Sequence, residues 1–158
     1  MAAVPTRPAD FAFPVRIYWE DTDAGGIVFY ANYLRFFERA RTEWLRALGY
    51  NQQELRDRTG GMFVVSDTRM RYLRPARLDD VLHVTVRMVE QGRSALTMAQ
   101  QAWRDAELLC EGEIRIGWVE HDAASGELRP RRVPAEVLAA LGQQALAASP
   151  NQKIQKTS

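Results

Sequence analysis

A change of hydrophobic period is the feature of this sequence that most restricts its fold. Between Tyr33 and Leu48, apolar side chains recur at helical spacing, and most charged side chains fall at the other positions. The apolar positions are Tyr33, Phe36, Phe37, Ala40, Trp44 and Leu48. Asn32 is the predicted N-cap of this helix, and Gly49 is the predicted residue after its C-cap. Such a helix, about 24 Å long at 1.5 Å per residue, needs a large apolar surface against which to pack.

Alternating segments elsewhere in the chain supply that surface. Five segments alternate between apolar and polar side chains, which predicts β-strands: 13–20, 62–73, 81–91, 94–105 and 108–122. In the first segment we expect Val15, Ile17 and Trp19 to lie on one face. The links RPARLDD, GRS and DAE between the later segments are short, which predicts that successive strands are antiparallel neighbours.

A second helix is expected at 135–146, because Pro134 precedes it and proline is common at a helix start. The order of strand, helix, four strands and helix predicts an α+β fold, a curved antiparallel five-stranded sheet wrapped around one long central helix. A chain of 158 residues fits one domain, here 13–146. We expect a flexible N-terminal arm at 1–12 and a flexible C-terminal tail at 147–158.

Charge and cysteine content exclude several classes of protein. The formal net charge is +1, from 21 basic and 20 acidic residues, whereas nucleic-acid-binding domains usually carry a strongly unbalanced charge. The single cysteine, Cys110, excludes an internal disulfide and a multi-cysteine zinc site, and it fits a reducing compartment. No apolar run is long enough for a signal peptide or a transmembrane helix. We therefore expect a cytoplasmic protein without a nucleic-acid partner.

The stretch EDTDAGG, residues 20–26, places three carboxylates and two glycines just before the helix. Asp and Gly favour turns, so we interpret Glu20 and Asp21 as structural turn residues. A calcium loop that began at Asp21 would need oxygen ligands at regular spacing and a glutamate at its twelfth position. Gly25 and Asn32 stand at two of those positions, so we expect no metal site.

The stretch EDTDAGGIVFYANYLRFFERAR (20–41), together with RYLRPARLDDVL (71–82), resembles the hotdog-fold thioesterases. More narrowly, the sequence is similar to the 4-hydroxybenzoyl-CoA thioesterase family and its tol-pal-associated (YbgC-type) branch, over about residues 13–135. The resemblance implies an acyl-CoA substrate and a homodimer whose active sites lie between the subunits. It also implies that Asp23 is the catalytic acid and that Tyr30 presents its backbone N–H to the thioester carbonyl.

The residue types of this motif suit thioester hydrolysis. A water molecule or a carboxylate must attack the carbonyl carbon, and Asp23 can serve as general base or as nucleophile; both roles stay open. Backbone N–H groups at a helix start are unpaired within the helix and lie at the positive end of its dipole, where they can stabilise an oxyanion. Gly25 and Gly26 let a substrate approach the backbone without a Cβ in the way.

Coenzyme A is expected as part of the substrate, and no separate cofactor is predicted. The turn QGRSAL (91–96) offers Arg93 and Ser94 to a phosphate, and the resemblance also implies coenzyme A contacts there. Where Tyr30 stands, the tol-pal branch commonly has histidine; where Ala31 stands, the hydroxybenzoyl-CoA enzymes have proline. The acyl group is therefore left open between short-chain aliphatic and aromatic.

The predicted function is hydrolysis of an acyl-CoA to the free acid and coenzyme A. A dehydratase of the same fold would need a histidine near the helix start, and neither His83 nor His121 is close to it in sequence. The alternative left open is a non-catalytic dimeric scaffold that binds acyl-CoA or an acyl carrier protein. The long, proline-free strand at 62–73 is the best candidate for an edge that pairs in a homodimer, which can double into a tetramer.

Overall fold

The computed structural model describes residues 11–147 of the chain. The strands are β1 (Phe11–Arg16), β2 (Gly61–Tyr72), β3 (Val81–Gln91), β4 (Ala95–Arg104), β5 (Glu107–His121) and β6 (Leu128–Pro130). The helices are α1 (Asn32–Ala47), α2 (Gln52–Thr59) and α3 (Ala135–Ala147), and a 3₁₀ turn, η1, spans Trp19–Asp21. The elements confirm the α+β class.

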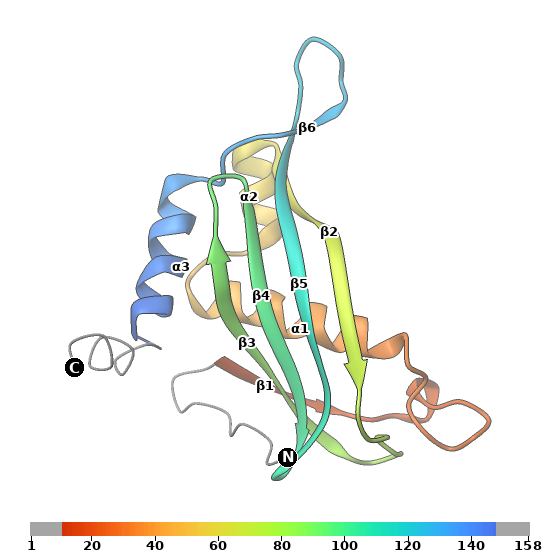
Figure 1. Cartoon of the computed structure of the whole chain (residues 1–158). Helices are drawn as coiled ribbons and strands as arrows, with labels where there is room; N and C mark the ends of the chain where they lie inside the picture. Colours follow the sequence, from red (N-terminus) through yellow and green to blue (C-terminus); the bar gives the residue numbers. More distant parts are fainter. Residues whose placement is uncertain (1–10, 148–158) are drawn as a thin grey trace.

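All six strands belong to one antiparallel sheet (Figure 1). The main strand order is β1-β3-β4-β5-β2, and β6 pairs with the end of β5. The prediction of a five-stranded sheet missed β6, because a strand of three residues is too short to show alternation. β1 and β2 form the two edges of the main order, so the expected edge position of the strand at 62–73 is confirmed.

The link between β2 and β3 contradicts the prediction that each short link joins neighbouring strands. The turns 92–94 and 105–106 do join neighbours, β3 with β4 and β4 with β5. The link at 73–80 instead joins two strands that are separated in the sheet by β5 and β4. Three strand spacings amount to roughly 14 Å, a distance that a link of this length spans easily.

The long helix α1 packs across the inner face of the sheet (Figure 1). Its predicted apolar stripe is buried, apart from a half-buried Leu48 just after its end: Tyr33, Phe36, Phe37, Ala40 and Trp44. Burial of each large apolar side chain stabilises the fold by about 1.5–3 kcal/mol. A polar link ties the middle of α1 to β4, since the buried Gln100 amide donates to the Phe37 carbonyl (3.0 Å) and accepts from Arg41 (2.8 Å).

The predicted end of α1 is correct, but its predicted N-cap is wrong. Gly49 has φ +94° and follows the C-cap residue, as predicted. Asn32, however, is not the N-cap. It is the first residue of α1, and Ala31 takes the cap position without a side-chain hydrogen bond. The Asn32 amide instead donates to the Asp21 carbonyl at 2.9 Å.

The strand β1 begins and ends earlier than predicted. Phe11 and Ala12, assigned to the N-terminal arm, pair with β3 in the sheet. Val15 and Ile17 are buried as expected, but Trp19 is 80% exposed, because the 3₁₀ turn breaks the alternation of the strand. The rest of the predicted arm (1–10) and residues 148–158 of the predicted tail lie outside the described residues; Ala147 is the last residue of α3.

The short helix α2 has no counterpart among the predicted elements. Its one buried side chain is Leu55, so it lacks the apolar stripe by which a helix is recognised. Its ends are nevertheless well defined, because Asn51 Oδ1 accepts from the N–H groups of Gln53 (2.9 Å) and Glu54 (3.3 Å), and Gly60 closes the helix at φ +73°. No helix in the described part of the chain is long and apolar enough to cross a membrane.

Candidate active site

A tight loop between η1 and α1 carries the predicted catalytic residues; we call residues 23–27 the glycine turn. Two backbone hydrogen bonds close it, from Asp23 N–H to the Ile27 carbonyl (2.9 Å) and from Phe29 N–H to the Asp21 carbonyl (3.0 Å). The loop projects from the end of the molecule at which β1 ends and β3 begins (Figure 1). The sequence prediction of a turn here is confirmed.

Within the glycine turn, the two glycines have different roles. Gly26 has φ +78°, a conformation that residues with a Cβ rarely adopt, and nothing lies within 4 Å of where its Cβ would be. The Gly25 N–H donates to Asp23 Oδ1 at 2.8 Å, and a Cβ on Gly25 would lie 3.1 Å from that oxygen. Gly26 therefore provides the conformation and an open approach, and Gly25 provides room for the carboxylate, which is exposed.

The backbone just before α1 provides two free donors. Asn32 N–H donates to the Phe29 carbonyl (2.9 Å), and Leu34 N–H donates to the Ala31 carbonyl (3.2 Å). The N–H groups of Tyr30 and Ala31 themselves have no acceptor within residues 11–147. They lie at the positive end of the α1 dipole, which favours negative charge beside them.

The carboxylate of Asp21 has a structural role, in agreement with the sequence interpretation. Its Oδ2 accepts from the Tyr18 N–H at 2.8 Å and stabilises the 3₁₀ turn. Its main-chain carbonyl accepts from both Phe29 N–H and the Asn32 amide. Asp21 thus stabilises the base of the loop, whereas the Asp23 side chain bonds only within the turn among the described residues.

The link at 73–80 supports the glycine turn from behind. Val28 N–H donates to the Ala76 carbonyl at 2.9 Å, and Ile27 pairs with Arg77. Asp80 Oδ2 in turn accepts from Arg77 N–H and from the Arg104 guanidinium, both at 2.8 Å. Partial burial of Asp80 opposes its ionisation, but these hydrogen bonds outweigh that effect and lower the pKa of its carboxyl below the ordinary value.

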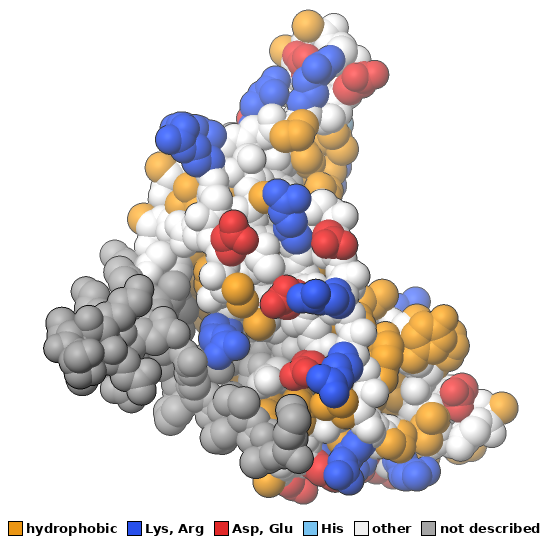
Figure 2. All heavy atoms as spheres, in the orientation of Figure 1, with side chains coloured by type: hydrophobic (Ala, Val, Ile, Leu, Met, Phe, Trp, Pro, Cys, Tyr) orange, Lys and Arg blue, Asp and Glu red, His pale blue; other side chains and the backbone are white. Residues whose placement is uncertain are grey.

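Aromatic side chains cluster at the segment that carries the free donors. The Tyr30 ring is 63% exposed and packs edge-on against Tyr72, with 5.9 Å between ring centroids; Tyr72 also contacts Tyr33. Burial raises the pKa of Tyr33 to about 12, so its phenol stays neutral at physiological pH. The exposed large hydrophobic side chains at this end include Tyr18, Trp19, Phe29, Leu34 and Leu73. Figure 2 shows hydrophobic side chains gathered at the end of the molecule that carries the loop.

The structure does not bring all predicted site residues together within one protomer. Asp23, Gly26 and Tyr30 share the loop, but Arg93 and Ser94 form the β3–β4 turn, at the opposite end of β3. A strand of the length of β3 spans roughly 35 Å at about 3.3 Å per residue. The Arg93 side chain is exposed, and Ser94 is half-buried.

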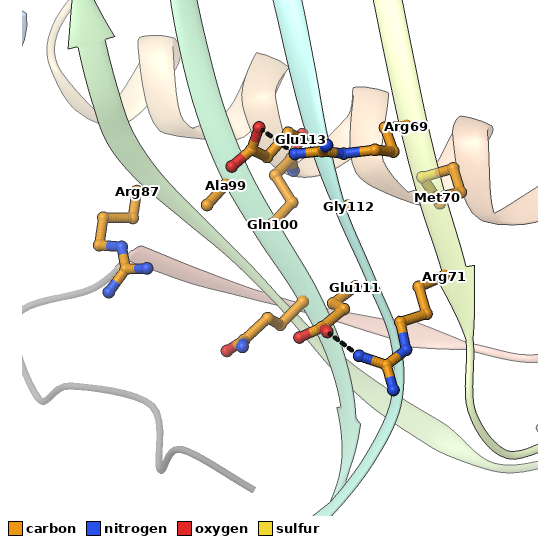
Figure 3. Close-up of a pocket in the computed structure, with 10 residues that line it drawn as sticks. Arg69, Met70, Arg71, Arg87, Ala99, Gln100, Glu111, Gly112 and Glu113 are labelled. Atoms are coloured by element: carbon orange, nitrogen blue, oxygen red, sulfur yellow. Dashed lines mark hydrogen bonds and ion pairs between the residues drawn. The ribbon is translucent and has the colours of Figure 1, made fainter.

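A separate cavity of about 570 Å³ lies on the outer face of the sheet (Figure 3). Four of its five charged side chains form cross-strand ion pairs between β2 and β5, Arg69 with Glu113 (2.9 Å) and Arg71 with Glu111 (3.7 Å). The fifth, Arg87 on β3, makes no ion pair among the described residues. Rows of opposite charge run down this face (Figure 2). The carboxylates are thus already neutralised by arginines, and the cavity includes none of the predicted site residues. Among residues 11–147, no three His, Cys, Asp or Glu side chains gather as metal ligands would.

Three residues that support the site escaped the sequence analysis as site residues. Tyr72 reaches the site from the end of β2, and Asp80 reaches it from the link at 73–80, an arrangement that no local pattern reveals. Asn32 was interpreted as a helix cap, although its position two residues after Tyr30 in ANY placed it beside the free donors. The second motif at 71–82 was the available signal for the other two.

Comparisons with known proteins agree with this architecture. The family model described as thioesterase-like superfamily matches residues 17–141. An acyl-CoA thioesterase YbgC of Haemophilus influenzae is 41% identical over 130 residues, which cover 82% of this chain and 93% of that protein. A probable thioesterase from Bartonella henselae has a solved structure with a TM-score of 0.69 and 30% identity, covering 79% of this chain and 98% of that one.

The 4-hydroxybenzoyl-CoA thioesterase of a Pseudomonas species shows the same fold, with a TM-score of 0.76 at 21% identity over 83% of this chain and 98% of that one. The hotdog fold expected from the motif is thereby confirmed. Since the family model spans most of the described residues and the Haemophilus relative is aligned over nearly its whole length, the chain belongs to the thioesterase-like superfamily and is an enzyme of the thioesterase class.

Proposed function

We propose that the protein hydrolyses the thioester of a short-chain aliphatic or aromatic acyl-CoA to the free acid and coenzyme A. One observation carries the proposal: the Asp23 carboxylate stands on a closed glycine turn, in the same loop as two backbone N–H groups that have no acceptor within the described residues. The name of the Haemophilus relative, an acyl-CoA thioesterase, supports the same substrate class. No separate cofactor takes part in this reaction.

The proposed chemistry divides the two tasks between Asp23 and the start of α1. As a general base, the Asp23 carboxylate takes a proton from water while the water oxygen bonds to the thioester carbon. The carbonyl oxygen becomes an oxyanion that accepts hydrogen bonds from Tyr30 N–H, with Ala31 N–H beside it. Collapse of this intermediate re-forms the carbonyl, breaks the carbon–sulfur bond and releases the coenzyme A thiolate. Asp23 then gives its proton to the thiolate or to solvent and is ready for the next cycle.

A nucleophilic role for Asp23 uses the same groups. One carboxylate oxygen bonds to the thioester carbon, the thiolate leaves, and water then hydrolyses the anhydride that has formed. In either route the leaving thiolate is a weak base, so the reaction has little need for a strong general acid. Tyr30 acts through its backbone N–H, and the open space beside Gly26 admits the thioester.

A homodimer is part of the proposal. Arg93 and Ser94, the proposed coenzyme A contacts, lie too far from Asp23 to serve the same site within one chain, so a partner chain is the natural source of the second set. Pairing of the β2 edges of two copies would bring the partner's residues to the site, since β2 is a long edge strand. Exposed Phe29, Tyr30 and Tyr72 beside the site are the apolar surface that a partner would cover.

Sedimentation of dilute protein tests this assembly. We expect a dimer at micromolar concentration, with doubling to a tetramer as an open alternative. A stable and active monomer of 18.0 kDa would remove the shared-site model. A cytoplasmic location remains a prediction. An acyl carrier protein as a second source of acyl groups also remains a prediction, so an acyl thioester of acyl carrier protein should be tested as a substrate.

The decisive experiment is a kcat/KM panel with acetyl-, hexanoyl-, palmitoyl- and 4-hydroxybenzoyl-CoA, in which a thiol reagent detects free coenzyme A. The folded protein will not consume the reagent, because Cys110 is fully buried and burial raises its pKa to about 12. We expect turnover of a short aliphatic or an aromatic substrate. Binding of all four without turnover would instead support the non-catalytic scaffold.

A further inference from the structure

We propose that Asn32 is a positioning residue, which holds the free N–H groups of Tyr30 and Ala31 in place relative to Asp23. The inference rests on the proposed thioester hydrolysis. It concerns a residue that does not touch the reacting atoms in that mechanism. Its side chain instead bridges the two segments that carry the reacting groups.

The geometry of this bridge is simple. The Asn32 amide, on the first residue of α1, donates to the main-chain carbonyl of Asp21 at 2.9 Å. Asp21 precedes Asp23 by two residues, and Asn32 follows Tyr30 by two. The same carbonyl accepts from Phe29 N–H at 3.0 Å. One oxygen therefore ties down the chain on both sides of the Tyr30–Ala31 pair.

The free donors need such external support. An N–H group that must bind an oxyanion cannot be fixed by a hydrogen bond of its own, so its direction depends on its neighbours. On one side, Phe29 is fixed by its bond to Asp21; on the other, α1 is fixed by the Asn32 bridge. The carbonyl that receives both bonds is itself held, because the Asp21 carboxylate accepts from Tyr18 N–H.

The chemistry of the bridge distinguishes donation from space filling. A carbonyl oxygen can only accept, so the Asn32 side chain must present its nitrogen to it. An aspartate at this position has the same shape but presents an oxygen, which repels the Asp21 carbonyl. Asn51 provides a matched opposite case at the start of α2, because its side-chain oxygen accepts from Gln53 and Glu54. Aspartate performs that role equally well.

The test compares Asn32→Asp with Asn51→Asp, with Asn32→Ala as a third variant, using the acyl-CoA that the wild type hydrolyses best. We expect kcat to fall about 10²-fold in Asn32→Asp, the scale of a misplacement of about 1 Å, with KM little changed. Asn32→Ala should lose less, since it removes the donor without adding repulsion. Asn51→Asp should match the wild type.

Several results would overturn the inference while leaving the proposed function intact. One is an Asn32→Asp variant as active as Asn51→Asp; another is a loss confined to KM; a third is a greater loss in Asn32→Ala than in Asn32→Asp, which would indicate a space-filling role. Thermal unfolding of each variant accompanies the kinetics. Should Asn32→Asp fail to fold, Asn32→Ala compared with Asn51→Ala decides, since only the former is expected to lose kcat. A wild type that hydrolyses no substrate in the panel removes the proposed function and this inference together.

Discussion

The two ends of the sheet differ in whether their backbone groups have hydrogen-bond partners. At the glycine-turn end, the backbone N–H groups of Tyr30 and Ala31 have no acceptor among the described residues. At the β3–β4 turn, Gly92 N–H donates to Ala95, and the carbonyls of Arg93 and Ser94 accept from Val133 and Trp118. There the exposed feature is the Arg93 side chain.

This difference indicates that the two ends have different roles, one in the reaction and one in substrate binding. Free backbone donors cannot be lost to a rotamer change and are suited to a developing charge, whereas a long exposed arginine is suited to binding a phosphate that does not react. We therefore expect substitutions at the glycine-turn end to lower kcat and substitutions at the β3–β4 turn to raise KM.

The largest effect is expected for Asp23→Asn, which keeps the shape of the side chain but removes its charge and basicity. We expect kcat to fall roughly 10²–10⁴-fold, the range for a positioned acid–base group, while acyl-CoA binding survives. Steady-state kinetics and equilibrium binding measure the two quantities separately. Near wild-type turnover by this variant would show that Asp23 is not the catalytic carboxylate.

Gly26→Val should have the next largest effect. Valine is strained at the φ of +78° found at Gly26, and its side chain would enter the open approach to Asp23. We expect kcat/KM to fall about 10²-fold. Gly126→Val is the matched control, because Gly126 has φ +73° and equally open surroundings but lies in the loop between β5 and β6. Equal activities of the two folded variants would contradict the prediction.

Arg93→Ala should raise KM about tenfold and leave kcat unchanged, the expected result for a lost phosphate contact worth about 1.4 kcal/mol. Arg132→Ala, a nearby exposed arginine, serves as the control.

Mixed dimers then test whether Asp23 and Arg93 of one site come from different chains. A dimer of one Asp23→Asn chain and one Arg93→Ala chain has one fully intact site only if each site takes Asp23 and Arg93 from different chains, so its KM should return to the wild-type value. A KM that stays high would place both residues in the same chain's site.

The smallest effect concerns the link behind the glycine turn. Asp80→Asn removes the charge that bonds Arg104, and we expect the free energy of unfolding to fall by about 1 kcal/mol. Because the folded-state pKa of Asp80 is lowered, this contribution is fully present above the ordinary aspartate pKa of about 3.9 and is lost as pH falls through the folded-state pKa. Urea unfolding of both proteins between neutral and acidic pH measures it. A stability difference that grows towards acidic pH would have the wrong sign.

Much of the fold was predictable because periodicity is local. The stripe from Tyr33 to Trp44 and the alternation in β3 and β5 depend on neighbouring residues alone, and they were interpreted correctly. The strand order was not predictable in this way, since β2 pairs with β5, a partner roughly fifty residues later in the chain. Trp19 shows the limit of alternation, because one 3₁₀ turn was enough to expose it.

The site residues also differ in how far they could be predicted from local sequence. Asp23, Gly26 and Tyr30 are close in sequence, so the motif brought them together without any knowledge of the fold. Arg93 is distant in sequence, and its position relative to Asp23 follows from the length of β3. The donor role of Asn32 depends on a carbonyl eleven residues earlier, a contact to which no propensity or period points.

The place of β2 in the sheet also has a consequence for the order in which the chain folds. The strands β3, β4 and β5 form a local meander whose neighbours can pair through short turns. β2 can pair only after β5 has been made, because β5 is its partner. During synthesis, therefore, the segment that carries the glycine turn leaves the ribosome long before the surface that supports it. Pulsed hydrogen exchange during refolding should protect amides of the meander before those of β2, and the reverse order would contradict this expectation. Chains halted before β5 would carry the aromatic-rich helix α1 on an incomplete sheet, in which β2 has no partner strand. We expect such chains to expose apolar surface and to be prone to aggregation.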